Sequence, residues 1–139
     1  MRFLLVALLS LGLTACVSQD QADEKMAKGC EAAVNILLKD EGKQLSEIKV
    51  KRYADEQAEG GLHRRITLMG IEKDGWLELD KSYSCLFAQD WGLFKSSHEA
   101  LLVQVQIDDQ LYGKKDGVIQ GTLEDFIKLT DAVHKAMGQ

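Results

Sequence analysis

The segment WLELDKSYSCLF, residues 76–87, alternates between apolar and polar side chains, which is the period of a β-strand with one buried face. The two faces of this strand hold Leu77, Leu79, Tyr83, Cys85 and Phe87 on one side and Glu78, Asp80 and Ser84 on the other. A strand with one solvent-exposed face is typical of an antiparallel sheet whose other face is covered by a second layer. Residues 76–87 therefore predict a sheet with one buried side.

Similar alternation before and after this segment predicts further strands, joined by short turns. The predicted strands are residues 47–54, with Ile48, Val50, Arg52 and Ala54 on one face, then 62–68, 101–107 and a short return at 118–120. Glycine-containing turns are expected at residues 60–61, 72–75 and 113–117. Residues 88–99 follow neither period and are predicted to form a loop, so the sheet is a meander of four to five strands.

A helix is predicted on each side of the meander. Residues 20–41 carry apolar side chains at intervals of three and four, and Gly42 stands where a helix ends. Thr122 is a suitable N-cap for a last helix whose stripe is Phe126, Leu129, Val133 and Met137. The predicted fold class is α+β, a two-layer sandwich with both helices on one side of the sheet.

The N-terminus has the features of a secretory signal. Arg2 gives a positive start, an apolar run follows, and Leu13-Thr14-Ala15 leads to Cys16. These last four residues resemble the lipobox of bacterial lipoproteins, which implies cleavage before Cys16 and a diacylglycerol on its thiol. In that family an aspartate after the cysteine favours the inner membrane. Val17 stands there instead, so the resemblance implies the outer membrane, facing the periplasm, over the inner membrane.

The predicted organisation follows from this signal. Residues 1–15 are the signal peptide, residues 16–22 are the lipidated cysteine and a polar tether, and residues 23–139 form a single domain. The alternative is an ordinary cleavable signal that leaves Cys16 as a spare thiol. Membrane attachment is expected through acyl chains, because the chain has a formal net charge of −5. The same acidity makes nucleic acid an unfavourable partner.

Two further cysteines, Cys30 and Cys85, fall on faces that are predicted to point into the core. An exported protein folds in an oxidising compartment, where a pair of thiols is more often a disulfide than two free nucleophiles. Such a bond would stabilise the domain by about 4 kcal/mol in the chain-entropy model. We therefore predict a disulfide between Cys30 and Cys85.

The sequence does not favour catalysis or a bound cofactor. His63, His98 and His134 are the candidate metal ligands, but they lack the local pairs typical of zinc sites, so no metal is predicted. The motifs Ser-x-x-Lys and Gly-x-Ser-x-Gly are absent. A hydrolase would need a carboxylate placed beside His98. The protein is accordingly predicted not to be an enzyme.

Two groups of residues are candidate binding sites. Trp76, Trp91, Leu93 and Phe94 form a possible interaction patch, the alternative being that Trp91 and Phe94 fold back onto the core. His63, Arg64 and Arg65 form a possible anion contact, the alternative being that both arginines pair with acidic residues of the segment 53–59.

From these features the sequence predicts a lipid-anchored, periplasm-facing module that binds an envelope protein or assists envelope assembly. The alternative is a carrier of a small ligand or metal, with His63, Arg64 and Trp91 at the mouth of a space between helix and sheet.

Overall fold

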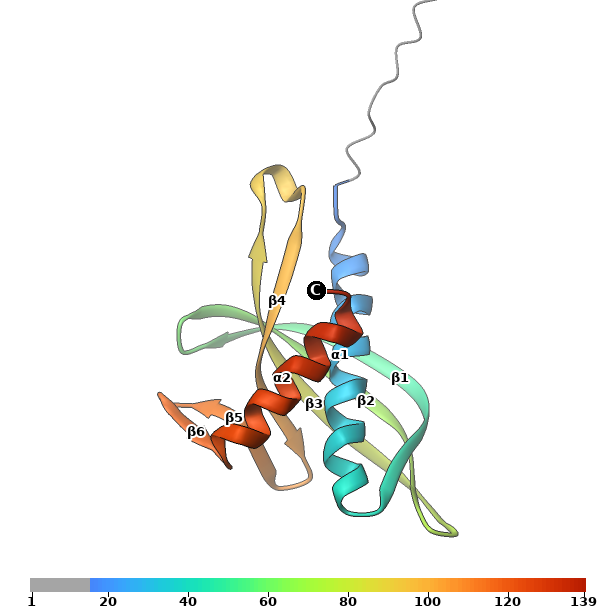
Figure 1. The fold of residues 1–139 in the computed structure, drawn as a ribbon. Coiled ribbons are helices and arrows are strands. Elements are labelled where there is room, and N and C mark those ends of the chain that lie inside the picture. The colour runs from blue at the N-terminus through green and yellow to red at the C-terminus, as the bar shows by residue number, and fades with distance from the viewer. Residues whose placement is uncertain (1–15) are drawn as a thin grey trace, which may run out of the picture.

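The computed structural model describes residues 16–139, and the predicted signal peptide, residues 1–15, lies outside them. Two helices flank six strands: α1 Gln19–Asp40, β1 Lys43–Ala58, β2 Gly61–Asp74, β3 Leu77–Trp91, β4 His98–Ile107, β5 Gln110–Lys115, β6 Val118–Gln120 and α2 Leu123–Met137. All neighbouring strands are antiparallel, in the order β1-β2-β3-β4-β5-β6 (Figure 1). The predicted α+β class with helices at both ends is confirmed, with one more strand than expected.

Helix α1 begins earlier than predicted because Ser18 caps it. The Ser18 hydroxyl accepts the backbone N–H of Gln21, and the Gln21 side chain accepts the N–H of Ser18, which together form a capping box. Ala22 and Asp23 are buried. The expected tether over residues 16–22 therefore shortens to Cys16, Val17 and Ser18.

A single core lies between the helices and one face of the sheet. From α1 it receives Met26, Cys30, Ala33 and Val34, and from α2 Leu129, Val133 and Met137. From the sheet it receives Ile66, Leu68, Tyr83, Cys85, Phe87, Leu102 and Val105. Every one of these side chains is at most 7% exposed.

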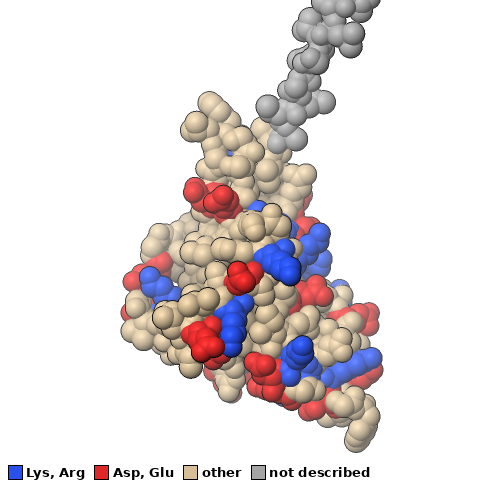
Figure 2. All heavy atoms as spheres, in the orientation of Figure 1, with Lys and Arg blue, Asp and Glu red and all other residues tan. Residues whose placement is uncertain are grey.

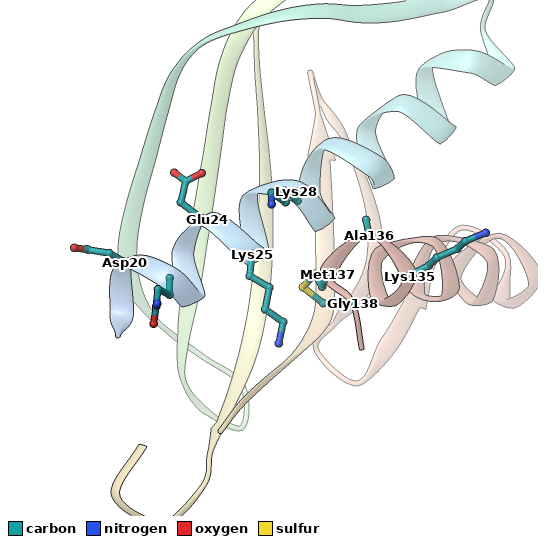
Figure 3. Close-up of a pocket in the computed structure, with 9 residues that line it drawn as sticks. Asp20, Glu24, Lys25, Lys28, Lys135, Ala136, Met137 and Gly138 are labelled. Atoms are coloured by element: carbon teal, nitrogen blue, oxygen red, sulfur yellow. The ribbon is translucent and has the colours of Figure 1, made fainter. Parts of the chain in front are cut away.

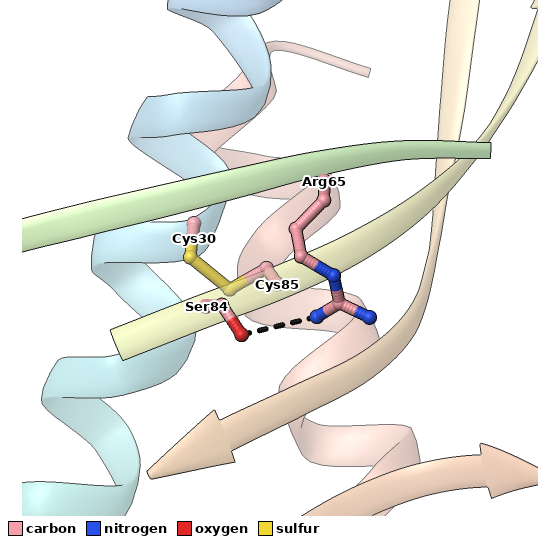
Figure 4. The surroundings of a disulfide bond; sticks show 4 residues. All are labelled: Cys30, Arg65, Ser84 and Cys85. Atoms are coloured by element: carbon pink, nitrogen blue, oxygen red, sulfur yellow. Dashed lines mark hydrogen bonds between the residues drawn. A yellow bond between two sulfur atoms is a disulfide. The ribbon is translucent and has the colours of Figure 1, made fainter. Parts of the chain in front are cut away.

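The disulfide joins the two layers of the structure. Cys30 of α1 and Cys85 of β3 are bonded, their Cα atoms are 5.7 Å apart, and both residues are fully buried. In Figure 4 Cys85 points from β3 towards α1, whereas its neighbour Ser84 lies on the other face of the strand and accepts a hydrogen bond from Arg65. The predicted pairing is thus present, on the buried face that Tyr83, Cys85 and Phe87 share. Leu77 and Leu79, which were predicted to lie on the same buried face, are 41% and 38% exposed because the far end of β3 extends beyond the core.

In β1 and β4 the predicted facing of several residues is wrong, because a β-bulge interrupts each strand. The register of β1 against β2 shifts between Ile48 and Val50, so Val50 is 42% exposed while Tyr53 packs against the core. A shift beside Leu86 likewise turns Leu102 into the core and leaves Leu101 51% exposed. An extra residue in one strand reverses the facing of everything beyond it, which strict alternation cannot anticipate.

Strand β5 is the one missed strand, because residues 113–117 were predicted to form a turn. Two tight turns flank it instead, Asp108-Asp109 and Asp116-Gly117, and both Asp108 and Asp116 have a φ of 51°. Aspartate tolerates this left-handed conformation better than most residues. The predicted loop at residues 88–99 is also too long, since β3 continues to Trp91 and β4 begins at His98.

Helix α2 packs against α1 through a glycine. A Cβ on Gly29 would lie 2.9 Å from Cγ of Met137 and 3.0 Å from Cγ1 of Val133. The two helices therefore lie side by side on the same face of the sheet, and Figure 1 shows α2 crossing in front of α1. This arrangement leaves the opposite face of the sheet without a helix.

Candidate functional site

The N-terminal end of the described chain is held against the hairpin that joins β3 to β4. Cys16 is exposed, and the backbone N–H of Val17 donates to the carbonyl oxygen of Lys95 at 2.9 Å. Lys95 belongs to the β3–β4 tip, which we define as residues 92–97 (Gly-Leu-Phe-Lys-Ser-Ser). The residue predicted to carry the lipid thus lies one position from a backbone contact with this tip.

The predicted aromatic patch is divided among three environments. Trp76 is 93% exposed in the turn between β2 and β3, at the opposite end of β3 from the tip. Leu93 and Phe94, in the tip, are 84% and 93% exposed. Trp91 is partly buried and packs against the core. These four residues therefore do not form one surface, and folding back onto the core applies to Trp91 but not to Phe94.

Trp91 packs on its other side against His98. The two ring centroids are 4.5 Å apart, and the ammonium group of Lys95 lies 5.3 Å from the centroid of the indole ring. His98 Nε2 donates to the side-chain oxygen of Gln89 at 2.9 Å, while its buried Nδ1 has no partner among the described residues. Burial, together with nearby Lys25, lowers the pKa of His98. His98 is thus a neutral packing residue at the base of the tip.

The two arginines of the predicted anion contact are occupied by carboxylates of the chain itself. Arg64 donates to Asp23 at 2.9 and 2.6 Å and to Asp55 at 2.9 Å. Arg65 donates to both oxygens of Glu56, one of them at 2.7 Å. The alternative of pairing with the segment 53–59 therefore describes both arginines, and Asp23 of α1 adds a partner that the sequence did not indicate.

His63 lies apart from Arg64, on the face of the sheet that no helix covers. Its Nδ1 donates to the carbonyl oxygen of Gly61 at 2.9 Å, and the residue is 6% exposed. Within residues 16–139, no three His, Cys, Asp or Glu side chains come together as a metal would require. His63, His98 and His134 are thus not brought into one site.

The uncovered face of the sheet contains a groove, which we call the far-face groove. Its volume is about 550 Å³, and Leu86, Leu101 and Val103 line it together with His63. The ends of the β1–β2 and β5–β6 hairpins form its rim, with acidic residues on the former and Lys114, Lys115 and Asp116 on the latter. An apolar floor with a charged rim is the usual composition of a ligand pocket. The space that the sequence placed between helix and sheet is instead filled by the core.

A second apolar surface lies on β6 and the first turns of α2. We call it the α2 patch; its members are Ile119, Leu123 and Ile127, which are 37%, 59% and 58% exposed. Leu123 and Ile127 are one helical turn apart, and Ile119, Leu123 and Ile127 line one shallow hollow of about 390 Å³. The sequence analysis did not predict this patch, although the one-turn spacing of Leu123 and Ile127, outside the buried stripe of α2, could have indicated it.

A further hollow of about 630 Å³ separates the N-terminal half of α1 from the end of α2 (Figure 3). Asp20, Glu24, Lys25, Lys28 and Lys135 line it with charges of both signs. Glu24 is already bound by Lys51 and Tyr53 of β1, at 2.9 and 2.8 Å. Lys25 donates to the carbonyl oxygen of His98 at 2.8 Å. These contacts tie α1 to the sheet and leave an open surface of mixed charge.

Comparison with protein-family models, with curated proteins and with solved structures finds no match to this chain. Neither helix in the part of the chain described here has the length and apolar composition needed to cross a membrane.

Proposed function

We propose that this protein is a lipid-anchored envelope lipoprotein of the outer membrane that faces the periplasm and binds another envelope protein through the α2 patch. The observation that carries the proposal is the shallow hollow that the exposed apolar side chains of Ile119, Leu123 and Ile127 line together on β6 and α2. Contiguous apolar surface rimmed by polar residues is typical of protein interaction sites. The anchor rests on the lipobox-like residues 13–16.

The surroundings of the α2 patch define the chemistry of its partner. Glu124, Asp125 and Asp131 are exposed on the same helix, and Lys128 is engaged with Glu124 at 3.1 Å. On β5 the exposed Lys114 is the strand partner of Ile119, so the rim is of mixed charge, with Glu124, Asp125 and Asp131 outnumbering Lys114 and Lys128. Such a surface is complementary to a partner that presents apolar anchors within a mostly basic surround. Such a partner would be attracted to the acidic protein from a distance and held by apolar burial.

We propose a binding role without catalysis because each buried polar side chain of residues 16–139 has a structural partner, His98 through one of its two ring nitrogens. Asp23 holds Arg64, and Glu72 accepts the hydroxyl of Tyr83. His98 is held by Gln89 and by the ring of Trp91. Each of these groups fastens one element of the fold to another, which is the common role of buried polar side chains.

The test is photo-crosslinking in intact cells, with a photoreactive amino acid at Ile127 in the full chain. Leu62 is the matched control position, because it is an apolar residue of similar exposure, 64%, on β2. We expect one dominant envelope protein to be captured from position 127 and not from position 62. Leu123→Ser should reduce that capture. Equal products from the two positions, or none from position 127, would contradict the proposal.

The far-face groove supports a second candidate, a periplasmic carrier of a small ligand. Its volume of about 550 Å³ lies within the range of small-molecule sites, and buried Leu86 forms part of its floor. Native mass spectrometry of protein purified from envelopes tests this role. A bound mass that disappears in Leu101→Arg and persists in Leu62→Arg would favour the carrier over the protein-binding module.

A further inference from the structure

We propose that the β3–β4 tip is a membrane contact, inserting Leu93 and Phe94 into the lipid surface beside the acylated Cys16. This inference rests on the acyl anchor of the proposed function. It goes beyond the anchor because it assigns to a protein loop a direct contact with lipid, and so a fixed orientation of the domain on the membrane.

The position of the tip is the first reason. The hydrogen bond of 2.9 Å from Val17 to the carbonyl oxygen of Lys95 joins the chain next to Cys16 with the tip. Consecutive Cα atoms are about 3.8 Å apart, so Cys16 stands within one residue of this contact. In Figure 1 the β3–β4 hairpin and the first turn of α1 lie next to each other at the same end of the molecule. Acyl chains on Cys16 would bring this end, and the tip with it, to the bilayer.

The exposure of the tip is the second reason. Leu93 and Phe94 are 84% and 93% exposed, although both are large apolar residues and the core is within reach of neighbouring Trp91. Phe94 and Lys95 have φ values of 55° and 56°. This left-handed conformation is unfavourable for residues other than glycine, asparagine and aspartate. The backbone thus holds an aromatic side chain away from the core, towards whatever covers the tip.

The charge of the tip is the third reason. Residues 92–97 contain Lys95 and no carboxylate, in a chain whose formal net charge is −5. In Figure 2 the tip itself shows no red acidic spheres, whereas red spheres lie just below it on the hairpin. Asp90 and Glu99, which are exposed and paired across β3 and β4, are the carboxylates nearest the tip in sequence. Lys95 is exposed, and its ammonium group lies over the ring of Trp91, which is itself half-buried. Tryptophan and lysine beside inserted apolar residues are the usual composition of a membrane interface.

A second contact beside the anchor determines what the rest of the domain faces. A lipid on Cys16 alone leaves the domain free to rotate about its short attachment, whereas the tip adds a separate point on the membrane. The start of α2 and strand β6 lie at the other end of α2 from residues 137–139, away from the hairpin (Figure 1). The α2 patch would then face the periplasm, where a partner can reach it.

The test is quenching of tryptophan fluorescence by lipids with brominated chains, using the full acylated protein in phosphatidylethanolamine and phosphatidylglycerol vesicles. The reporter protein carries Phe94→Trp and Trp76→Phe, so it contains two tryptophans, as the original chain does. The original chain is the control, since its Trp76 is 93% exposed at the far end of β3. We expect fractional quenching about twofold greater in the reporter, because aromatic residues that insert reach the depth of the acyl chains. Adding Leu93→Asp to the reporter should abolish the difference.

Flotation of the same samples separates the two proposals. Protein that floats with the vesicles but shows equal quenching in reporter and control would overturn the membrane contact and leave the acyl anchor standing. Protein that does not float at all would overturn the anchor and, with it, the contact. Phe94 and Trp76, the two substituted residues, are both exposed, so the far-UV circular dichroism of reporter and control should be the same.

Discussion

Removing the disulfide should reduce the stability of the domain by about 4 kcal/mol. The perturbation is Cys30→Ala with Cys85→Ala, made in residues 16–139 with Cys16→Ser so that no other thiol is present. The two cysteines are 55 residues apart in sequence. The chain-entropy relation for a loop of this length gives about 4 kcal/mol at 25 °C. The small cavity left by two fully buried sulfur atoms adds a minor cost.

This loss is large beside the total stability of a small domain, which is about 5–15 kcal/mol. Equilibrium unfolding in urea, followed by far-UV circular dichroism, measures it against the Cys16→Ser parent. We expect a lower transition midpoint together with a steeper dependence on urea, because the unfolded chain without its crosslink exposes more surface. A difference below about 1 kcal/mol with an unchanged slope would refute the argument that the bond acts by restricting the unfolded chain.

Three further predictions test the structure at other points. Burial lowers the pKa of His98 below its ordinary 6.5, so protonation favours the unfolded chain and stability should fall as the pH drops below 6.5. The free energy of unfolding should fall less between pH 8 and pH 5 in His98→Phe than in the parent. A Cβ on Gly70 would overlap the backbone carbonyl oxygen of Glu47, which cannot move without shifting the strand, so Gly70→Ala should cost about 1–3 kcal/mol. Gly75→Ala, which meets no neighbour but has a φ of 62°, should cost about 1 kcal/mol in the same urea assay. Asp23→Asn breaks a buried pair with Arg64 and should cost about 3 kcal/mol. Asp80→Asn is the control, since its pair with Lys49 is exposed and should contribute less than about 1 kcal/mol; similar losses from both would contradict the difference in burial.

Periodicity was sufficient to predict the elements that bury one face. The spacing of Met26, Cys30 and Val34 predicted the buried side of α1, and the alternation of Tyr83, Cys85 and Phe87 predicted the buried side of the second half of β3. Together these two faces brought the cysteines into contact. Such features depend on local repetition and on one shared core, which a sequence displays directly.

Features that depend on a neighbouring segment were not predictable in this way. The bulges of β1 and β4 arise from pairing between strands, and β5 carries too few apolar residues to show a period. For Arg64 the alternative to an anion contact, an acidic partner in the segment 53–59, holds for Asp55, but its second partner, Asp23, is 41 residues away. The sequence singled out Leu93 and Phe94 as candidates, but whether Phe94 or Ile127 is exposed depends on what else covers it, so their exposure is seen only in the folded chain.

Because Ser18 caps α1, only a short link separates Cys16 from the folded domain. Three residues, Cys16 to Ser18, precede the first helical residue. At a maximum of about 3.5 Å per residue they span roughly 10 Å. With the proposed acyl chains on Cys16, a link of this length would keep the domain at the membrane surface, unlike a long flexible linker. A binding partner would then have to reach the bilayer surface, and two copies would meet by diffusing in the plane of the membrane.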